Sequence, residues 1–412
     1  MTGPHDLLLG LLSPAGRVDP YPYYRHLVER WPVLPITRER LLVTGYQECV
    51  DVLVNPRLFP VPDRHCADRL WPAWHTFPST DLLYRSLLFR NAPDNQPARR
   101  LLARFFGPDE VARMRPMITR HAEAGTAPFG AARAVVDAAR TFTTIPNGVM
   151  GELLGLPRHD EEMLAGWVNS FLERNELHPP DKALAVADEA ATRLVEHLDA
   201  TVGGETPLVR TLAGHGRLSA GDLMSNLVFL LGAGTVTTGS LLGTGVRRLA
   251  ARNDLLPRLR EDDALLRSFV QETLRYDPPI QYGVRVAAED TELAGVPLPR
   301  DSVVLVSFGA LGRDPARFAD PDVFVADRFD TPEPAVRDVL SFGLGAHRCA
   351  GAELALVTSE IAFRLLAARV DAITEAGRPE RQARAVTRGY TKLAVEVVPV
   401  GRSFPEGATT VR

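Results

Sequence analysis

A single cysteine in a glycine-rich loop, directly before a predicted helix, constrains this chain more than any other feature. The loop runs from Phe342 to Gly351 and reads FGLGAHRCAG, with Cys349 as its cysteine. Gly343 and Gly345 allow backbone angles and close approaches that other residues forbid. The following helix presents unpaired N–H groups and the positive end of its dipole toward the sulfur, which favours thiolate over thiol. The pattern therefore predicts a thiolate that binds a ligand, and Gly351 leaves room for a flat one.

Two plainer interpretations of Cys349 compete with this one. A lone cysteine is most often a buried structural residue. A zinc site would need further ligands, and no second cluster of Cys and His has metal-ligand spacing. The three cysteines, Cys49, Cys66 and Cys349, are too few and scattered for a disulfide scaffold, and they favour a reducing compartment. The specificity of the whole loop pattern favours the ligand-binding interpretation.

The charge and the N-terminal residues bear on partners and location. The formal net charge is −4 at pH 7, so no basic excess points to nucleic acid or to an anionic membrane. The apolar stretch from Leu7 to Leu12 is too short to span a bilayer and lacks a basic leader. We expect a cytoplasmic protein with no membrane and no nucleic-acid partner.

The hydrophobic spacing predicts a mainly helical chain with minor strands, an α+β fold, in one domain over residues 1–412. Proline and glycine, 33 and 32 residues, are scattered rather than gathered in a linker. Residues 33–44 suit a short hairpin and residues 47–54 a short helix. Residues 60–92, rich in proline and aromatics, suggest a long irregular segment. Helical spacing follows over residues 98–106, 110–124, 130–153, 158–175 and 180–202.

The second half of the chain carries clearer helix signals. A capping motif at residues 219–222 opens a long apolar helix over about 220–250. A helix over residues 262–276 stops before Pro278, because the residue before proline avoids helical geometry. The remainder is predicted, in order, as short strands over 282–308, a helix from just after Cys349 to about residue 368, and a terminal hairpin over 386–400.

A second motif joins the cysteine loop. Glu272-Thr273-Leu274-Arg275 forms an E-x-x-R pair, whose members share one face of a helix, beside apolar residues that suggest burial. With both motifs, nearly the whole chain resembles the cytochrome P450 family. That resemblance implies a triangular prism of helices around a buried haem b, with Cys349 as the thiolate ligand of iron and Phe342 shielding the sulfur. A thiolate ligand favours O–O cleavage. The resemblance gives Glu272 and Arg275 a structural role.

The resemblance also implies further haem contacts. Arg285 and His347 match groups that bind the haem propionates, and guanidinium suits carboxylate geometrically. Arg99 retains a third such position in the run Asn95-Gln96-Pro97-Ala98-Arg99. The family commonly has histidine where this chain has Asn95, which can hydrogen-bond but cannot carry charge. The remaining positions expected against the haem are Gly343, Gly351, Ala233 and Gly234.

The long central helix departs from the family at one position that matters for chemistry. The family pattern is A-G-x-(D/E)-T-T, and this chain reads Ala233-Gly234-Thr235-Val236-Thr237-Thr238. Thr237 matches the alcohol that assists oxygen activation, and we assign it as the catalytic residue. A threonine that merely bonds back to its helix is the plainer alternative. Val236 stands where an acid normally relays protons.

Three readings of the Val236 departure stay open. Protons could come through water ordered by threonine hydroxyls, or a polar group on the substrate could supply the relay. Both leave ordinary hydroxylation or epoxidation. Alternatively the reaction needs less proton delivery, as in radical coupling, nitration or peroxide-driven oxidation. A haem-binding protein without turnover is a further, weaker alternative.

The resemblance gives the substrate class and partners only in outline. We expect a small organic substrate, an intermediate of secondary metabolism such as antibiotic biosynthesis, free or bound to a carrier protein. The chain has no dinucleotide fingerprint and no cysteine set for an iron–sulfur cluster. Electrons are therefore expected from a ferredoxin and its NAD(P)H-dependent reductase. The candidate substrate contacts are Val236, Tyr282, Val284, Tyr390, Trp74 and Phe89.

Overall fold

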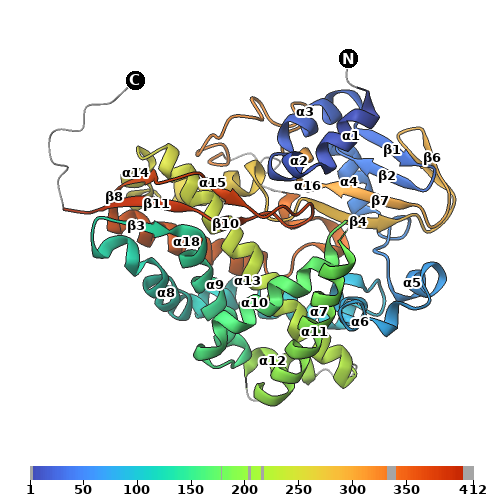
Figure 1. Cartoon of the computed structure of the whole chain (residues 1–412), viewed down its shortest axis with the longest axis horizontal. Helices are drawn as coiled ribbons and strands as arrows, with labels where there is room; N and C mark the ends of the chain where they lie inside the picture. Colours follow the sequence, from blue (N-terminus) through green and yellow to red (C-terminus); the bar gives the residue numbers. More distant parts are fainter. Residues whose placement is uncertain (1–2, 178, 203–205, 215–217, 332–339, 402–412) are drawn as a thin grey trace.

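The structure, a computed structural model, describes residues 3–177, 179–202, 206–214, 218–331 and 340–401. Helices dominate, and the strands form small sheets that lie on both sides of the molecule in the view of Figure 1. This confirms the predicted mainly α fold with minor β. The α-helices are α1 Pro4–Leu12, α2 Pro14–Val18, α3 Tyr21–Arg30, α4 Tyr46–Val54, α5 Arg64–Leu70, α6 Pro78–Arg85, α7 Gln96–Phe105, α8 Pro108–Ala131, α9 Ala138–Leu154, α10 Glu161–Leu172, α11 Asp181–Thr201, α12 Pro207–Ala213, α13 Ala220–Ala251, α14 Leu255–Glu261, α15 Asp263–Tyr276, α16 Phe308–Leu311 and α18 Ala352–Arg369.

The strands belong to four small sheets. The largest, in the order β1-β2-β7-β4, contains the predicted hairpin and one parallel pair, β2 with β7. A second sheet has the order β3-β11-β8, and the two-stranded sheets are β10-β9 and β5-β6. The strands are β1 Val33–Thr37, β2 Arg40–Val43, β3 Ala134–Asp137, β4 Tyr282–Val286, β5 Thr291–Leu293, β6 Val296–Leu298, β7 Val303–Ser307, β8 Val370–Glu375, β9 Glu380–Arg381, β10 Tyr390–Lys392 and β11 Ala394–Pro399.

Helix α13 runs through the centre of the molecule, between α9, α10 and α18 (Figure 1). Its predicted start is confirmed, because the Ser219 hydroxyl accepts a hydrogen bond from the Asp222 N–H at 3.1 Å. This helix is long and apolar enough to cross a membrane, but 61% of its most apolar window is buried inside the protein. Its hydropathy is therefore accounted for by the core that it fills.

Glycines let neighbouring helices approach α13 closely. A Cβ at Gly234 would lie 2.6 Å from the Met150 sulfur of α9, and one at Gly245 would lie 2.2 Å from the Phe363 ring of α18. Both distances are well inside van der Waals contact. The glycines of this helix thus serve the packing of helix against helix.

Three segments differ from the prediction. Residues 60–92 are not irregular throughout, because they contain α5, α6 and short 3₁₀ turns. The helix expected from residue 130 begins at Ala138, and the preceding residues form β3, which pairs with β11. The hairpin expected over 386–400 does not exist as such, because β10 pairs with β9 whereas β11 pairs with β3 and β8.

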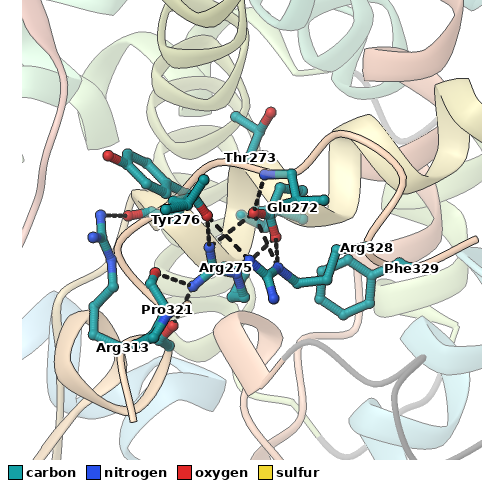
Figure 2. A network of polar contacts seen from close by, with 12 residues as sticks. Glu272, Thr273, Arg275, Tyr276, Arg313, Pro321, Arg328 and Phe329 are labelled. Atoms are coloured by element: carbon teal, nitrogen blue, oxygen red, sulfur yellow. Dashed lines mark hydrogen bonds and ion pairs between the residues drawn. The ribbon is translucent and has the colours of Figure 1, made fainter. Parts of the chain in front are cut away.

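The Glu272–Arg275 pair is buried, as predicted, and it organises the loop after α16 (Figure 2). The Arg275 guanidinium donates to both carboxylate oxygens of Glu272, at 2.6 and 2.8 Å. It also donates to the backbone carbonyls of Gly312, Pro321 and Val323. Because Glu272 and Arg275 are both buried and each charge is paired, the network fixes the segment that leads toward the cysteine loop.

A second buried charge cluster ties the two ends of the chain together. The Asp277 carboxylate, at the end of α15, pairs with Arg381 of β9 and with Arg388, whose Nε lies 2.6 Å away. It also accepts a hydrogen bond from the Tyr21 hydroxyl of α3 at 2.6 Å. Helix α3, near the N-terminus, and the segment that contains Arg381 and Arg388, near the C-terminus, therefore both bind the Asp277 carboxylate.

Candidate functional site

The cysteine loop has the left-handed backbone that its glycines predict. Gly343 has φ +70° and Gly345 has φ +67°. A side chain at Gly345 would also lie 2.7 Å from the Leu53 carbonyl oxygen, so the loop packs directly on α4. The Cys349 N–H donates to the Phe342 carbonyl at 2.8 Å, which closes the loop just before α18. A Cβ at Gly351 would meet nothing within 4 Å, so space is open there.

The Cys349 thiol does not favour ionisation by itself. Burial raises its pKa, against the lowering effects of the Gly351 N–H and the charges of Arg348 and Arg99. The side chain of Cys349 nevertheless has exposed surface. The Gly351 N–H and Arg348 thus lower the pKa as expected, although burial outweighs them in the protein chain alone. A bound cation is what would hold the sulfur deprotonated at this position.

Three cationic or hydrogen-bonding side chains converge beside the cysteine without a carboxylate. Burial lowers the pKa of Arg285 to about 10, and its guanidinium donates only to the neighbouring Val284 carbonyl. Burial also lowers the pKa of Arg99, whose guanidinium donates to the Arg348 carbonyl. Burial, then Arg285 and Arg99, lower the pKa of His347 to about 3. Within the described ranges, none of Arg99, Arg285 and His347 forms an ion pair.

Buried cations without a counter-charge are costly, so this cluster calls for an anionic ligand. The two carboxylates of haem b fit it, and the open space at Gly351 and Cys349 fits the flat ring. When bound, haem supplies redox chemistry that protein side chains lack. Among the described residues, no group of three His, Cys, Asp or Glu side chains could hold a metal ion, which leaves Cys349 as a single protein ligand.

Asn95 has a local partner in the protein. Its side chain is buried, and Nδ2 donates to the Arg90 carbonyl at 2.7 Å. This bond holds the turn that precedes α7 and thereby Arg99. Asn95 therefore helps to position α7, and its expected haem contact stays a prediction.

The central helix separates the roles of neighbouring residues. The Thr237 hydroxyl donates to the Ala233 carbonyl at 2.6 Å, which leaves its oxygen free to accept a further hydrogen bond. A Cβ at Gly234 would meet Met150 of α9, so helix packing by itself requires a glycine here, and the expected approach to haem stays a prediction. The Val236 side chain lines a cavity bounded by α9 and α10.

The expected substrate contacts divide into separate groups. Trp74 and Phe89 flank Tyr84, with ring centroids 5.2 and 5.1 Å from it. Val236 and Tyr390 line the same cavity beside α13. Val284 is half-buried and packs against the main core.

Tyr282 is not available to a substrate. Its side chain is buried among residues of the N-terminal helices, and its oxygen accepts a hydrogen bond from the Tyr24 hydroxyl at 2.8 Å. Tyr282 and Val284 lie on the same face of β4, but Tyr282 packs in the cluster formed with the N-terminal helices, whereas Val284 packs against the main core. The expectation for Tyr282 is therefore wrong.

Residues 173–176 contact two distant segments of the chain, and no sequence pattern predicted these contacts. Glu173 pairs with Arg384, and Glu176 accepts hydrogen bonds from the backbone N–H groups of residues 385–387. The Arg174 guanidinium lies over the stacked rings of Trp71 and Phe77, at 5.0 and 5.7 Å from their centroids. Each contact made by residues 173–176 joins positions at least 90 residues apart, so no local sequence pattern predicts it.

Comparison with known proteins places the chain in a family. A family model described as "Cytochrome P450" matches residues 197–369. Cytochrome P450 BJ-3 of Bradyrhizobium diazoefficiens is 32% identical over 95% of this chain and 96% of its own length. The 6-deoxyerythronolide B hydroxylase of Saccharopolyspora erythraea is 32% identical over 88% of this chain and 92% of its own.

The fold agrees with these sequence matches. The crystal structure of P450BioI, in complex with an acyl carrier protein ligated to hexadec-9Z-enoic acid, superposes with a TM-score of 0.81 at 26% identity. The superposition covers 92% of this chain and 99% of that one. Together with the cysteine loop and the buried E-x-x-R pair, these likenesses show that the chain belongs to the cytochrome P450 family of haem-binding monooxygenases.

Proposed function

We propose that this protein hydroxylates or epoxidises a small organic substrate, an intermediate of secondary metabolism. One atom of O₂ would enter the substrate, and the electrons would come from a ferredoxin and its NAD(P)H-dependent reductase. The observation that carries the proposal is the convergence of Cys349 with two arginines, Arg99 and Arg285, and the neutral imidazole of His347, a set of donors suited to the carboxylates of one haem. In this arrangement Cys349 binds the iron, and the three donors orient the ring through its carboxylates.

The names of the similar proteins support the substrate class. One relative is a hydroxylase of 6-deoxyerythronolide B, and one solved structure contains an acyl chain held on an acyl carrier protein. We therefore propose a substrate of the same kind of pathway, either free or attached to a carrier protein. Trp74, Phe89, Val236, Val284 and Tyr390 remain the proposed substrate contacts.

The proposed electron partner is supported by exposed basic side chains. Arg104 and Arg348 are exposed and are suitable for contact with an acidic ferredoxin. Arg113 is also exposed but pairs with Glu110, so it contributes less net charge. We propose a single domain that works in the cytoplasm and receives its electrons from a ferredoxin and a separate reductase.

The test combines binding and turnover on the haem-loaded protein. A panel of polyketides, terpenoids, amino acids and carrier-bound acyl chains is titrated while the Soret band is followed. We expect a saturable shift with one class, and then oxygenated product with a ferredoxin, its reductase, NAD(P)H and O₂. The Cys349→Ser variant should lose both the thiolate spectrum with carbon monoxide and turnover. A normal thiolate spectrum without product from any substrate would contradict the proposal.

Val236 favours a second candidate, oxidation with little proton delivery, such as radical coupling, nitration or peroxide-driven oxidation. Its apolar side chain lines a cavity where the family pattern has a carboxylate. Comparing product formation with hydrogen peroxide against that with O₂ and NAD(P)H separates the two candidates. Faster product formation with peroxide alone would favour the second.

A further inference from the structure

Two adjoining cavities lie along the flank of α13, between α9 and α10, which pack beside it (Figure 1). The larger has a volume of about 190 Å³ and extends to β10. The smaller has a volume of about 10 Å³. Asn147, Ala165 and Thr235 line both, so the two cavities meet at these residues.

The walls of the larger cavity suit water. Side-chain amides and hydroxyls line it, among them those of Thr143, Asn147, Asn169, Ser240 and Gln382. Its volume is more than ten times the roughly 10–15 Å³ that one water needs, and each water requires two to four polar partners. No carboxylate occurs among the described residues that line it. The smaller cavity has room for about one water.

The smaller cavity has one ionisable group on its wall, Glu161. This residue begins α10 and is half-buried, so its carboxyl group lies between the cavity and solvent. Burial raises the pKa of Glu161, against the opposing effects of His121 and Arg158. The protonated acid is thus favoured more than for an ordinary surface glutamate.

The other end of this route is the segment Thr235–Val236–Thr237. Val236, Ser240 and Gly243 all line the larger cavity, as expected for residues four and three positions apart on one helix face. An acid at position 236 would therefore face the cavity. Thr235 lines both cavities, and its hydroxyl donates to the Leu231 carbonyl while its oxygen can accept from water. Thr237 lies one position after Val236, about 100° around the helix, and is not among the residues that line either cavity.

We propose that Glu161 supplies protons through these two cavities to the Thr235–Thr237 segment, in place of the carboxylate that position 236 lacks. The inference rests on the proposed monooxygenase function. That reaction converts R–H, O₂, NAD(P)H and H⁺ into R–OH, water and NAD(P)⁺. Glu161 passes one proton to cavity water and regains it from solvent, so it is not consumed. Glu161 is a positioning residue, because it acts through water and Thr235.

The first test is the coupling of NAD(P)H consumption to product in Glu161→Gln. We expect product per NAD(P)H to fall at least about fivefold, less than the 10²–10⁴ that direct proton transfer typically contributes, with hydrogen peroxide released instead. Glu161→Asp should restore part of the coupling. The substrate-induced Soret shift and the thermal midpoint should stay unchanged. The matched control is Glu189→Gln, since Glu189 is an exposed helix glutamate that pairs with Arg193.

The second test moves the acid to the cavity wall. Glu161→Gln combined with Val236→Asp should recover coupling, because a carboxylate at position 236 would face the same water. A crystal structure of the haem-loaded protein should show water in both cavities. Coupling unchanged in Glu161→Gln, or two dry cavities, would overturn the inference. Absence of product from the wild type would instead overturn the proposed function, whatever the cavities contain.

Discussion

At the scale of single residues, Arg285 carries a buried positive charge that a haem carboxylate would neutralise. Its guanidinium is buried, its pKa is lowered by that burial, and it donates only to a neighbouring carbonyl. A buried charge in this state is destabilising until a counter-charge arrives. Haem binding and the burial of this charge are therefore coupled.

Removing that charge should weaken haem binding. A hydrogen bond to a charged group contributes about 1.5–3 kcal/mol. Arg285→Leu should therefore weaken haem affinity by about 10- to 150-fold. Transfer of haem to an excess of an apo-globin measures the change. Arg64→Leu is the control, because Arg64 is exposed and its nearest carboxylate, Asp94, lies 4.0 Å away. Equal transfer from both variants would contradict a propionate role for Arg285.

Tyr282 gives a second prediction at this scale. Tyr282→Phe removes one of the two acceptors of the Tyr24 hydroxyl and leaves Gln281 Oε1 at 3.1 Å, so the free energy of unfolding should fall by no more than about 0.5–1.5 kcal/mol. The midpoint of the substrate-induced Soret shift should not move. Chemical denaturation of this variant, of Tyr24→Phe and of the double variant measures the shared bond. A shifted Soret midpoint would return Tyr282 to the substrate site.

At the scale of elements, the close contact between α13 and α18 depends on Gly245. In Gly245→Ala the new Cβ would lie 2.2 Å from the Phe363 ring, and overpacking of this kind costs about 1–3 kcal/mol. In Gly166→Ala the new Cβ would meet nothing within 4 Å on α10, and alanine should stabilise that helix by about 0.5–1 kcal/mol. Urea denaturation should thus shift in opposite directions for the two variants. Equal shifts would mean that α13 and α18 separate easily.

The elements best predicted from sequence are those with strong local signals. The central helix has a serine cap and a long apolar run, α15 has a proline stop, and the first hairpin pairs within a few residues. The cysteine loop was predicted in detail because its glycines carry the conformation. In each case the determining interactions lie close together in the chain.

The elements that were mispredicted depend on distant partners or on short length. β3 was expected to be helical, and only pairing with β11 makes it a strand. β10 and β11 were expected to pair with one another, but the chain changes sheet between them. α5 and α6 are only 7 and 8 residues long, and Pro78, expected to break structure, occupies the first turn of α6.

The functional residues that sequence missed share the same physical cause. Glu161 looks like any acid in the first turn of a helix. Its significance comes from a cavity wall built by α9, α10 and α13 together. Likewise, the side-chain direction of Val236 could be placed only once the neighbours of α13 were known.

At the scale of the whole molecule, the cluster around Asp277 should govern stability at low pH. Burial acts to raise the pKa of Asp277, but the charges of Arg381 and Arg388 and the Tyr21 hydroxyl hold it well below its usual range. In the unfolded chain the pKa of Asp277 has its ordinary value of about 3.9. The stabilisation by this charge cluster therefore exists above that pH and is lost as the pH falls. The free energy of unfolding should decline from about pH 5 downward and should go on declining below about pH 3, because the folded-state pKa lies well below the unfolded one.

Two variants isolate this contribution. Asp277→Asn leaves two buried guanidinium groups uncompensated and should cost about 3–5 kcal/mol near pH 7. Its stability should then fall less steeply with acid than that of the wild type. Asp254→Asn is the control, because Asp254 forms an exposed pair with Arg252 worth about 0–1 kcal/mol. Parallel pH profiles for the wild type and Asp277→Asn would contradict the assignment.

The pairing of β3 with β11 also determines how late in translation this sheet can form. Ala134 pairs with Val397, so about 260 residues must be translated between the two strands. At about 5–20 residues per second, β3 waits roughly 13–50 s on the ribosome before its partner exists. Arg99 and Arg285 are made before Cys349, near the end of the chain. A nascent chain therefore cannot capture haem early, and during that wait the unpaired edge of β3 is open to chaperones or to misassembly.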